Sequence, residues 1–217
     1  MNIIEEAITF AGENLILTNQ RALYWPKEEA LILSDLHLGK AAHFRKHGIA
    51  LPIQIAERDI YRLEYLIAYY AVRQVVVTGD LIHAGANEEV KLFAVLTARF
   101  PKTTFILIKG NHDRISDHIL ETIGIHAVQR TLRIGDICFS HEHVEGMAGA
   151  TISGHIHPGV SLQLPTNKQL RYPCYAVTET QIILPAFSTF TGLDTVSIPD
   201  EAVCYAFYEQ GFFKSIK

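Results

Sequence analysis

Five short segments of this chain carry side chains that can bind metal ions. In chain order they cover residues 34–39, 79–80, 110–113, 141 and 154–157. Their Asp, Asn and His side chains offer seven oxygen and nitrogen ligands, enough for two divalent ions side by side. A single D-x-H or H-x-H pair is common in unrelated proteins. Five segments with possible metal ligands, in this order and each after a hydrophobic run, are unlikely to occur by chance. The leading hypothesis is therefore hydrolysis of a phosphate ester.

The types of ligand restrict the metal. Asp, Asn and His without Cys favour borderline to hard ions such as Mn²⁺, Fe²⁺ or Zn²⁺, and disfavour a structural zinc site made of thiolates. Two such ions about 3.5–4 Å apart stabilise both the attacking and the leaving oxygen of an in-line displacement at phosphorus. They also lower the pKa of a shared water, so that hydroxide is available near neutral pH. The sequence therefore predicts a dinuclear metal centre.

Two of the segments alternate polar and apolar residues. In Asp35-Leu36-His37 and His155-Ile156-His157, the two polar side chains are separated by one apolar residue. In an extended segment, residues two apart point to the same side, so each pair can bind one ion or divide between neighbouring ions. We expect the apolar residue of each pair to turn into the protein.

The first half of the chain alternates predicted strands and helices. Three short apolar runs are predicted to be buried strands, at 30–33, 75–77 and 104–108. Apolar residues recur at helical spacing from about 53 to 72, and a second helix is predicted from about 87 to 99 with Asn87 as its N-cap. Because polar segments follow the strands at their carboxyl ends, we expect the ligands to gather at one edge of a sheet.

The rest of the chain is predicted to be mainly strands. The runs before residue 26 are 7–10, 15–18 and 22–25, and a short helix is predicted at 116–123. The later runs are 132–134, 137–140, 151–153, 160–164, 172–177 and 181–184. The predicted fold class is α/β (α+β), with two packed, mainly mixed β-sheets flanked by helices. We expect residues 1–217 to form a single domain.

Composition agrees with a globular enzyme of the cytoplasm. A chain of 217 residues can bury a large core without disulfides, and no apolar stretch approaches the about 18 residues of a spanning helix. The start of the chain lacks the pattern of a secretory signal, so no membrane association is expected. Cys138, Cys174 and Cys204 are predicted to be reduced and buried. The net charge of −4 disfavours a general basic surface for nucleic acid, but two bound divalent ions would make the site electropositive.

These segments resemble the motifs of the calcineurin-like metallophosphoesterases. The resemblance implies that Asp35, His37 and His157 hold one metal ion. It implies that Asn111, His141 and His155 hold the other, and that Asp80 bridges the two. His143 is an alternative ligand to His141, which is favoured because it directly follows the run 137–140.

The same resemblance assigns the chemistry of the leaving group. It implies that metal-bound hydroxide attacks phosphorus while His112 acts as the general acid that protonates the leaving alkoxide. Asp113 would orient His112. Both residues lie in the segment 110–113, directly after a predicted strand.

A narrower resemblance covers nearly the whole chain. Segments 34–49, 79–85, 171–174 and 184–192 resemble the bacterial DNA-ligase-associated metallophosphoesterases. This implies an enzyme with two Mn²⁺ ions that acts as a DNA phosphodiesterase or endonuclease in repair, in functional association with a DNA ligase and a helicase. It leaves the oligomeric state open.

Several residues near the metal segments are candidate substrate contacts. Lys40 and Arg45 follow the first metal pair, and a point charge and a bidentate fork both suit phosphate. The alternative is a solvated basic turn before the helix that begins near 53. His83 is either a substrate or second-layer contact or an ordinary loop histidine, and His143 is a further candidate if it is not a ligand. Segment 187–192 either lines the site or is a tight connection.

Two other functions remain open. One is a phosphoesterase for a small nucleotide or a lipid-linked pyrophosphate, although the sequence offers no apolar insertion to serve as a lid over a lipid. The other is an interaction module that keeps the fold without catalysis. The complete ligand set and His112 argue against the second.

Overall fold

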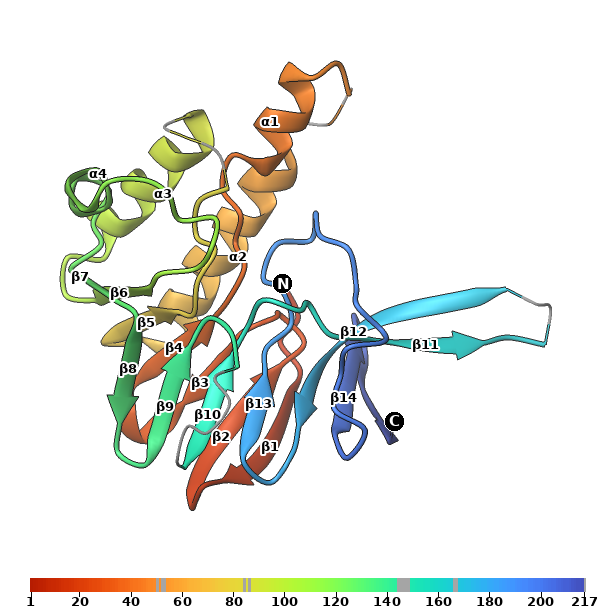
Figure 1. The fold of residues 1–217 in the computed structure, drawn as a ribbon. Coiled ribbons are helices and arrows are strands. Elements are labelled where there is room, and N and C mark those ends of the chain that lie inside the picture. The colour runs from red at the N-terminus through yellow and green to blue at the C-terminus, as the bar shows by residue number, and fades with distance from the viewer. Residues whose placement is uncertain are drawn as a thin grey trace.

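Two β-sheets pack face to face in this protein (Figure 1). The computed structural model describes residues 1–49, 51, 54–83, 85, 87–143, 149–165 and 168–216. Helices cover the outer face of the first sheet, and side chains of both sheets form the core between them. This arrangement confirms the predicted fold class.

The first sheet has the strand order β1-β2-β3-β4-β5-β6-β7. Its strands are β1 (Glu5–Phe10), β2 (Glu13–Thr18), β3 (Leu23–Trp25), β4 (Ala30–Leu33), β5 (Gln74–Val77), β6 (Thr104–Ile108) and β7 (Ala127–Gln129). The strands β1 to β4 form an antiparallel meander, whereas β4 to β7 are parallel. Leu33 pairs with Val77 and Val77 with Leu107, so β4, β5 and β6 end at the same level.

The second sheet has the order β15-β14-β12-β13-β10-β9-β8, with β11 paired to β12. Its strands are β8 (Thr131–Ile134), β9 (Ile137–Ser140), β10 (Ala150–Ser153), β11 (Gly159–Gln163), β12 (Gln169–Val177), β13 (Gln181–Ile183), β14 (Val203–Tyr208) and β15 (Gly211–Ile216). Strands β9, β10 and β13 are parallel, and the others pair antiparallel. The β11–β12 hairpin projects from the body (Figure 1).

The helices follow from amphipathic patterns. They are α1 (Lys40–Lys46), α2 (Gln54–Tyr70), α3 (Glu88–Arg99) and α4 (Asp117–Thr122), with a 3-10 turn at Pro26–Glu28. The Asn87 side chain accepts hydrogen bonds from the N–H groups of Glu89 and Val90, which confirms the predicted N-cap of α3. The predicted start of the preceding helix at Ile53 lies outside the described residues. No helix in the described part of the chain is long and apolar enough to cross a bilayer.

The core has one layer on each side of the first sheet. Leu63, Leu66 and Phe93 of α2 and α3 pack on its outer face, and Trp25 and Phe139 meet between the two sheets. Strand β4 is buried at every residue and β5 at every residue but the first, because both faces of the sheet are covered there. The cysteines Cys138, Cys174 and Cys204 are free and buried, as predicted.

Four elements differ from the predictions. The segment after the first metal pair was expected to be a loop or turn but forms α1, which begins directly after Gly39. Strands β14 and β15 at the end of the chain were not predicted, nor was the short strand β7. Helix α1 and strand β7 are short, and β7 and β15 lie at sheet edges, so their local patterns are weak and tertiary contacts decide their structure. Strand β14 has six residues and pairs with β12 and β15 inside the second sheet, and it was missed all the same.

Candidate metal centre

The candidate ligands come together at the ends of parallel strands from both sheets. Asp35 and His37 follow β4, Asp80 follows β5, and Asn111 follows β6. His141, His155 and His157 follow β9 and β10 of the second sheet in the same way. Strand ends that are level in each sheet place their following loops at one edge, as the sequence predicted.

The backbone is left-handed at five of the seven candidate ligands. The angle φ is +57° at Asp35, +50° at His37, +51° at Asp80, +73° at His155 and +52° at His157. Left-handed conformations of non-glycine residues cost energy and occur where the surrounding structure imposes them, often at functional sites. The two Asp/His-x-His pairs are therefore not extended, contrary to the prediction from alternation. Their side chains converge because the chain turns sharply at each ligand.

A first cluster consists of Asp35, His37 and His157. Its ligand atoms lie within 4.8 Å of one another. The Oδ1 atom of Asp35 is 3.2 Å from His157 Nε2 and 3.8 Å from His37 Nε2, and the two imidazole nitrogens are 3.3 Å apart. Burial lowers the pKa of His37 to about 3, so this imidazole is neutral and keeps a lone pair for a metal ion. Burial opposes ionisation of Asp35, but interactions with His157, Ser34 and His141 together outweigh it, so the pKa of Asp35 is lowered.

A second cluster consists of Asp80, His141 and His155, with ligand atoms again within 4.8 Å of one another. His141 Nδ1 donates to the Thr78 carbonyl oxygen at 2.9 Å, which leaves Nε2 as the acceptor. That Nε2 lies 3.1 Å from His155 Nδ1 and 3.5 Å from Asp80 Oδ1.

Asn111 completes the second cluster. Its Oδ1 lies 3.1 Å from His141 Nε2, so two acceptor atoms face each other. Turned over, the same amide would donate to His141 and Asp80. The orientation with the oxygen inward is the one that a cation requires, because a cation satisfies several acceptors at once.

Asp80 lies between the two clusters. Its Oδ2 is 4.0 Å from His37 Nε2 of the first cluster, and its Oδ1 is 3.5 Å from His141 Nε2 of the second. The Oδ1 atom also accepts a hydrogen bond from the His112 N–H at 2.9 Å. The carboxylate is therefore placed where one group can reach an ion in either cluster, which is the position the resemblance implies for a bridging ligand.

The residues present fit two divalent cations. Asp35 Oδ1 is buried and accepts no hydrogen bond from any described residue, although imidazole nitrogens face it. A buried acceptor without a donor is costly unless something positive satisfies it. Oxygen and imidazole ligands without thiolate suit divalent ions of borderline to hard character.

Glycines before the ligands allow this close convergence. A Cβ atom at Gly154 would overlap the side chains of Ser34 and Asp35, and one at Gly110 would overlap Asp80. A Cβ at Gly79 would overlap the ring of His141. At these positions the backbone of one loop lies directly against a ligand from another, so a glycine is required.

Comparison with known proteins identifies the family. Residues 30–149 match the family model of the calcineurin-like phosphoesterases, and this range holds β4 to β9 and most of the candidate ligands. The chain is a calcineurin-like phosphoesterase. It is therefore an enzyme that hydrolyses phosphoester bonds, and the two His/Asp clusters fit the pair of divalent ions typical of the family.

A solved structure of a nuclease has a similar fold. The phosphoesterase is similar to the nuclease MPE of Pseudomonas putida, with 27% sequence identity, a TM-score of 0.79, and coverage of 94% of this chain and 96% of that one. It also matches a protein of unknown function from Aquifex aeolicus, AQ665, with 15% identity, a TM-score of 0.41, and coverage of 59% of this chain and 78% of that one. No curated protein matches the chain.

His112 lies beside the clusters of the phosphoesterase. Its ring stacks on His83 with a centroid distance of 4.5 Å and lies 5.6 Å from the ring of His37. His83 is thus in contact with the candidate acid. Burial lowers the pKa of His83, which favours the neutral imidazole.

Asp113 contacts the backbone of two loops. Its carboxylate accepts hydrogen bonds from the N–H groups of Ile82 and Gly110, both at 2.9 Å. Burial raises the pKa of Asp113 to about 6. No hydrogen bond joins this carboxylate to the His112 imidazole in the described part of the chain. Asp113 therefore positions the loops that carry Asp80 and His112.

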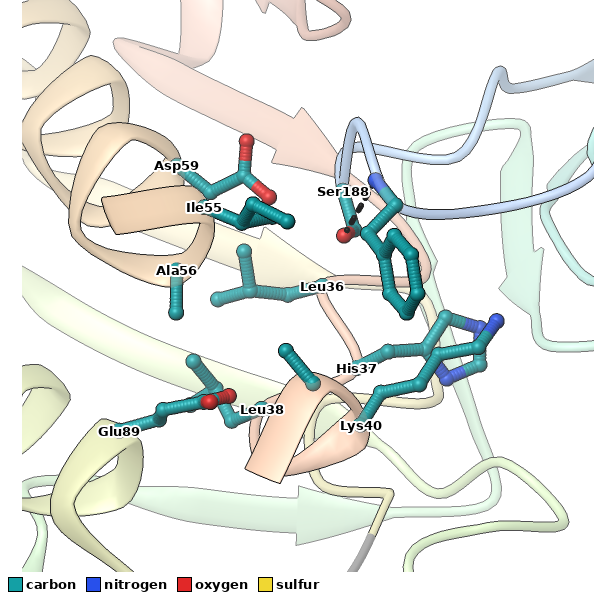
Figure 2. A pocket seen from close by; sticks show the side chains of 11 residues that line it. Leu36, His37, Leu38, Lys40, Ile55, Ala56, Asp59, Glu89 and Ser188 are labelled. Carbon is teal, nitrogen blue, oxygen red and sulfur yellow. Dashed lines mark hydrogen bonds between the residues drawn. The ribbon is translucent and has the colours of Figure 1, made fainter. Parts of the chain in front are cut away.

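Among the candidate substrate contacts, Lys40 lies beside the first cluster. Lys40 lines the same pocket as His37, and their side chains run side by side (Figure 2). Burial lowers the pKa of Lys40, while Asp35 and Asp80 favour its charged form. Lys40 therefore brings a cation to the edge of the first cluster, as a phosphate contact requires.

Arg45 and His143, two other candidates, are not placed as Lys40 is. The Arg45 guanidinium forms an ion pair with Glu89 of α3 at 3.2 Å, and Glu89 also accepts a hydrogen bond from the Gly39 N–H at 2.6 Å. Arg45 thus holds α1 against α3. His143 is exposed, and it is His141 rather than His143 that joins Asp80 and His155. The geometry favours the preferred ligand over its alternative.

A supporting network beneath the first cluster was missed. The Ser188 N–H donates to the Asp35 carbonyl at 3.1 Å and the Phe187 N–H to the Ser34 carbonyl at 2.7 Å, so segment 186–188 extends along the first metal loop. Arg62 of α2 donates to the Phe187 carbonyl and packs 4.3 Å from its ring centroid. Asp59 pairs with Arg62 at 2.8 Å. The sequence signal for this network was an Asp and an Arg on the apolar face of the helix predicted at about 53–72.

Proposed function

We propose that this phosphoesterase is a Mn²⁺-dependent phosphodiesterase that cleaves DNA internally. The observation that carries the proposal is the placement of Asp80 between two clusters of buried or partly buried ligands. Similarity over 94% of the chain to a nuclease supports a nucleic-acid substrate. A role in DNA repair in the cytoplasm, beside a ligase and a helicase, rests on the resemblance of the segments described above.

In the proposed mechanism the seven predicted ligands hold the ions, and the other residues handle the substrate. Two divalent ions held here would act as Lewis acids toward the phosphate and make hydroxide available near neutral pH. Lys40 binds a non-bridging phosphate oxygen at the edge of the first cluster. His112 gives a proton to the leaving oxygen as its bond to phosphorus breaks.

The substrate is tested with protein stripped of metal by a chelator. Mn²⁺, Fe²⁺, Zn²⁺ or Mg²⁺ is then added, and cleavage of circular single-stranded DNA, circular duplex DNA, bis-p-nitrophenyl phosphate and free nucleotides is measured. We expect Mn²⁺ to support cleavage of circular DNA, which has no ends and so reports an endonuclease. Hydrolysis of nucleotides or pyrophosphates alone would instead establish the small-substrate function.

The role of His112 as general acid is tested with substrates that differ in their leaving groups. His112→Ala should slow DNA cleavage by about 10²- to 10⁴-fold, because an alkoxide needs a proton to leave. The loss should be much smaller for bis-p-nitrophenyl phosphate, since nitrophenolate leaves without one. An equal loss on both substrates would assign His112 to the structure of the site. His118→Ala is the matched control, because His118 is an exposed residue of α4.

A further inference from the structure

A cavity of about 540 Å³ opens beside the candidate acid. Its lining includes the imidazoles of His112 and His83, the apolar side chains of Ile115 and Ile119, and Arg114. This volume is in the range of small-molecule sites, about 300–1,000 Å³. His112 is thus shared between the metal centre and the cavity.

Apolar side chains form part of the cavity lining. Ile115 and Ile119 are partly buried and line the cavity. Ile115 packs on the core of the first sheet, so this side of the cavity rests on a fixed surface.

Arg114 is exposed and oriented. Its Nε donates to the Asn111 carbonyl at 3.2 Å, which fixes one edge of the guanidinium. Among the described residues, no partner is found for its two terminal nitrogens. A guanidinium held in this way presents a fork suited to a phosphate group.

We propose that this cavity binds the nucleotide on the leaving side of the scissile phosphate. The inference rests on the proposed function and adds a polarity to it. A group that protonates the leaving oxygen must lie next to that oxygen, so a cavity that shares His112 receives whatever the oxygen is attached to. An apolar surface suits the face of a base or sugar, and the Arg114 fork suits the next phosphate along the strand.

The proposal is consistent with hydrolysis of the bond. Water supplies the oxygen that joins phosphorus, the bond to the leaving oxygen breaks, and His112 returns a proton to that oxygen. The product in the cavity is then a nucleotide or oligonucleotide with a free hydroxyl group. No further reactant is needed.

The test compares substrates that differ on the leaving side. Arg114→Ala and Ile119→Glu are assayed in the Mn²⁺-loaded protein on a thymidine oligonucleotide and on bis-p-nitrophenyl phosphate. We expect kcat/KM for the oligonucleotide to fall at least about tenfold more than for the small diester, mainly through KM, because a charge-assisted hydrogen bond or an apolar contact is lost. Arg114→Lys and Ile119→Leu should restore part of the difference. Lys102→Ala, before β6 at the opposite end of that strand, is the matched control.

A third substrate tests whether the cavity binds the leaving nucleotide or the nucleotide that stays on phosphorus. In thymidine 5′-p-nitrophenyl phosphate the nitrophenolate leaves and thymidine stays on phosphorus, so both variants should treat it like the small diester. A loss as large as that on the oligonucleotide would place the nucleotide on the other side and overturn the assignment. Equal losses on all substrates, or none, would also overturn it.

Failure of the proposed function gives a different result. If the unaltered protein hydrolyses the small diester but no oligonucleotide, DNA is not the substrate and the cavity assignment is wrong with it. If the unaltered protein cleaves DNA and the variants do so equally well, the proposed function stands and only the cavity assignment is wrong. Thermal unfolding midpoints of the variants identify any loss caused by misfolding.

Discussion

The two ligand clusters differ in how deeply they lie. In each cluster two ligands are buried, Asp35 and His37 in the first and Asp80 and His141 in the second. The third ligand differs, because the His157 side chain of the first cluster is 18% exposed and the His155 side chain of the second is 38% exposed. Asn111, which completes the second cluster, is also exposed. The second cluster is therefore more open to solvent than the first.

The difference lies in what supports each cluster. The Asp35 loop pairs with segment 186–188, which Arg62 and Asp59 hold from below. The second cluster depends on hydrogen bonds between loops, such as His141 to the Thr78 carbonyl. Ligands held rigidly lose little freedom when a metal binds. We therefore expect the first cluster to bind its ion more tightly, and the second to exchange its ion more readily.

The largest effect is expected where the clusters meet. Asp80→Ala removes a carboxylate that lies within 4.0 Å of a ligand nitrogen in each cluster. Hydrolysis of bis-p-nitrophenyl phosphate should fall on the order of 10³-fold or more, and the metal content by elemental analysis should drop in a protein that stays folded. Full activity in this variant would remove the two-metal mechanism.

A smaller loss of activity is expected from a substitution where the Gly154 backbone packs against the Asp35 loop. Gly154→Ala places a methyl group against Ser34 and Asp35, so one of these must move. A shift of about 1 Å can cost roughly 10²-fold in rate. Gly192→Ala is the matched control, because a Cβ there meets nothing within 4 Å. Equal rates for the two variants would show that the metal loops are not tightly packed.

The contrast between the clusters can be measured directly by titration. Calorimetry with Mn²⁺ on metal-depleted protein should show a tight and a weak site. His37→Ala should abolish the tight phase, and Asn111→Ala should weaken the other by more than the about 10- to 100-fold typical of losing a second-layer partner. If His37→Ala instead weakens the weak phase, the ranking of the two clusters is reversed.

The smallest effect on activity is expected from the network beneath the first cluster. Arg62→Met leaves Asp59 buried without its partner, which should lower the free energy of unfolding by about 3–5 kcal/mol. Arg99→Met, which breaks an exposed pair with Glu64, should cost less than about 1 kcal/mol.

In the Arg62→Met variant, Mn²⁺ binding should be affected differently at the two clusters. Because the network contacts the Asp35 loop of the first cluster, Mn²⁺ affinity should fall at the tight site, while activity at saturating Mn²⁺ changes less than about tenfold. Denaturant unfolding and calorimetry check both expectations. Unchanged affinity at the tight site would show that segment 186–188 does not hold the Asp35 loop.

Much of the fold could be predicted because its central strands are strongly apolar. The runs that became β4, β5 and β6 are buried on both faces, so their pattern is unambiguous. The hairpin of β14 and β15 was missed although Gly211 lies between two apolar runs. Helix α1 was missed because seven residues give too short a period to recognise.

The site was predicted in composition but not in geometry. The residues that could hold metal were found because each follows a strand, and the structure brings them together. The backbone conformation was predicted wrongly, since alternation indicated extended segments and the ligands are left-handed. The pairing of Arg45 with Glu89 was also invisible, because it joins residues 44 positions apart.

The sequence by itself determined which side chains could carry the chemistry and which strands bring them to one edge, because residue type and apolar period are local properties. Only the tertiary structure decided that Asp80 lies between two clusters, that Arg45 pairs with Glu89, and that a cavity adjoins His112. Those features depend on the packing of loops from two sheets, and no local pattern records how such loops meet.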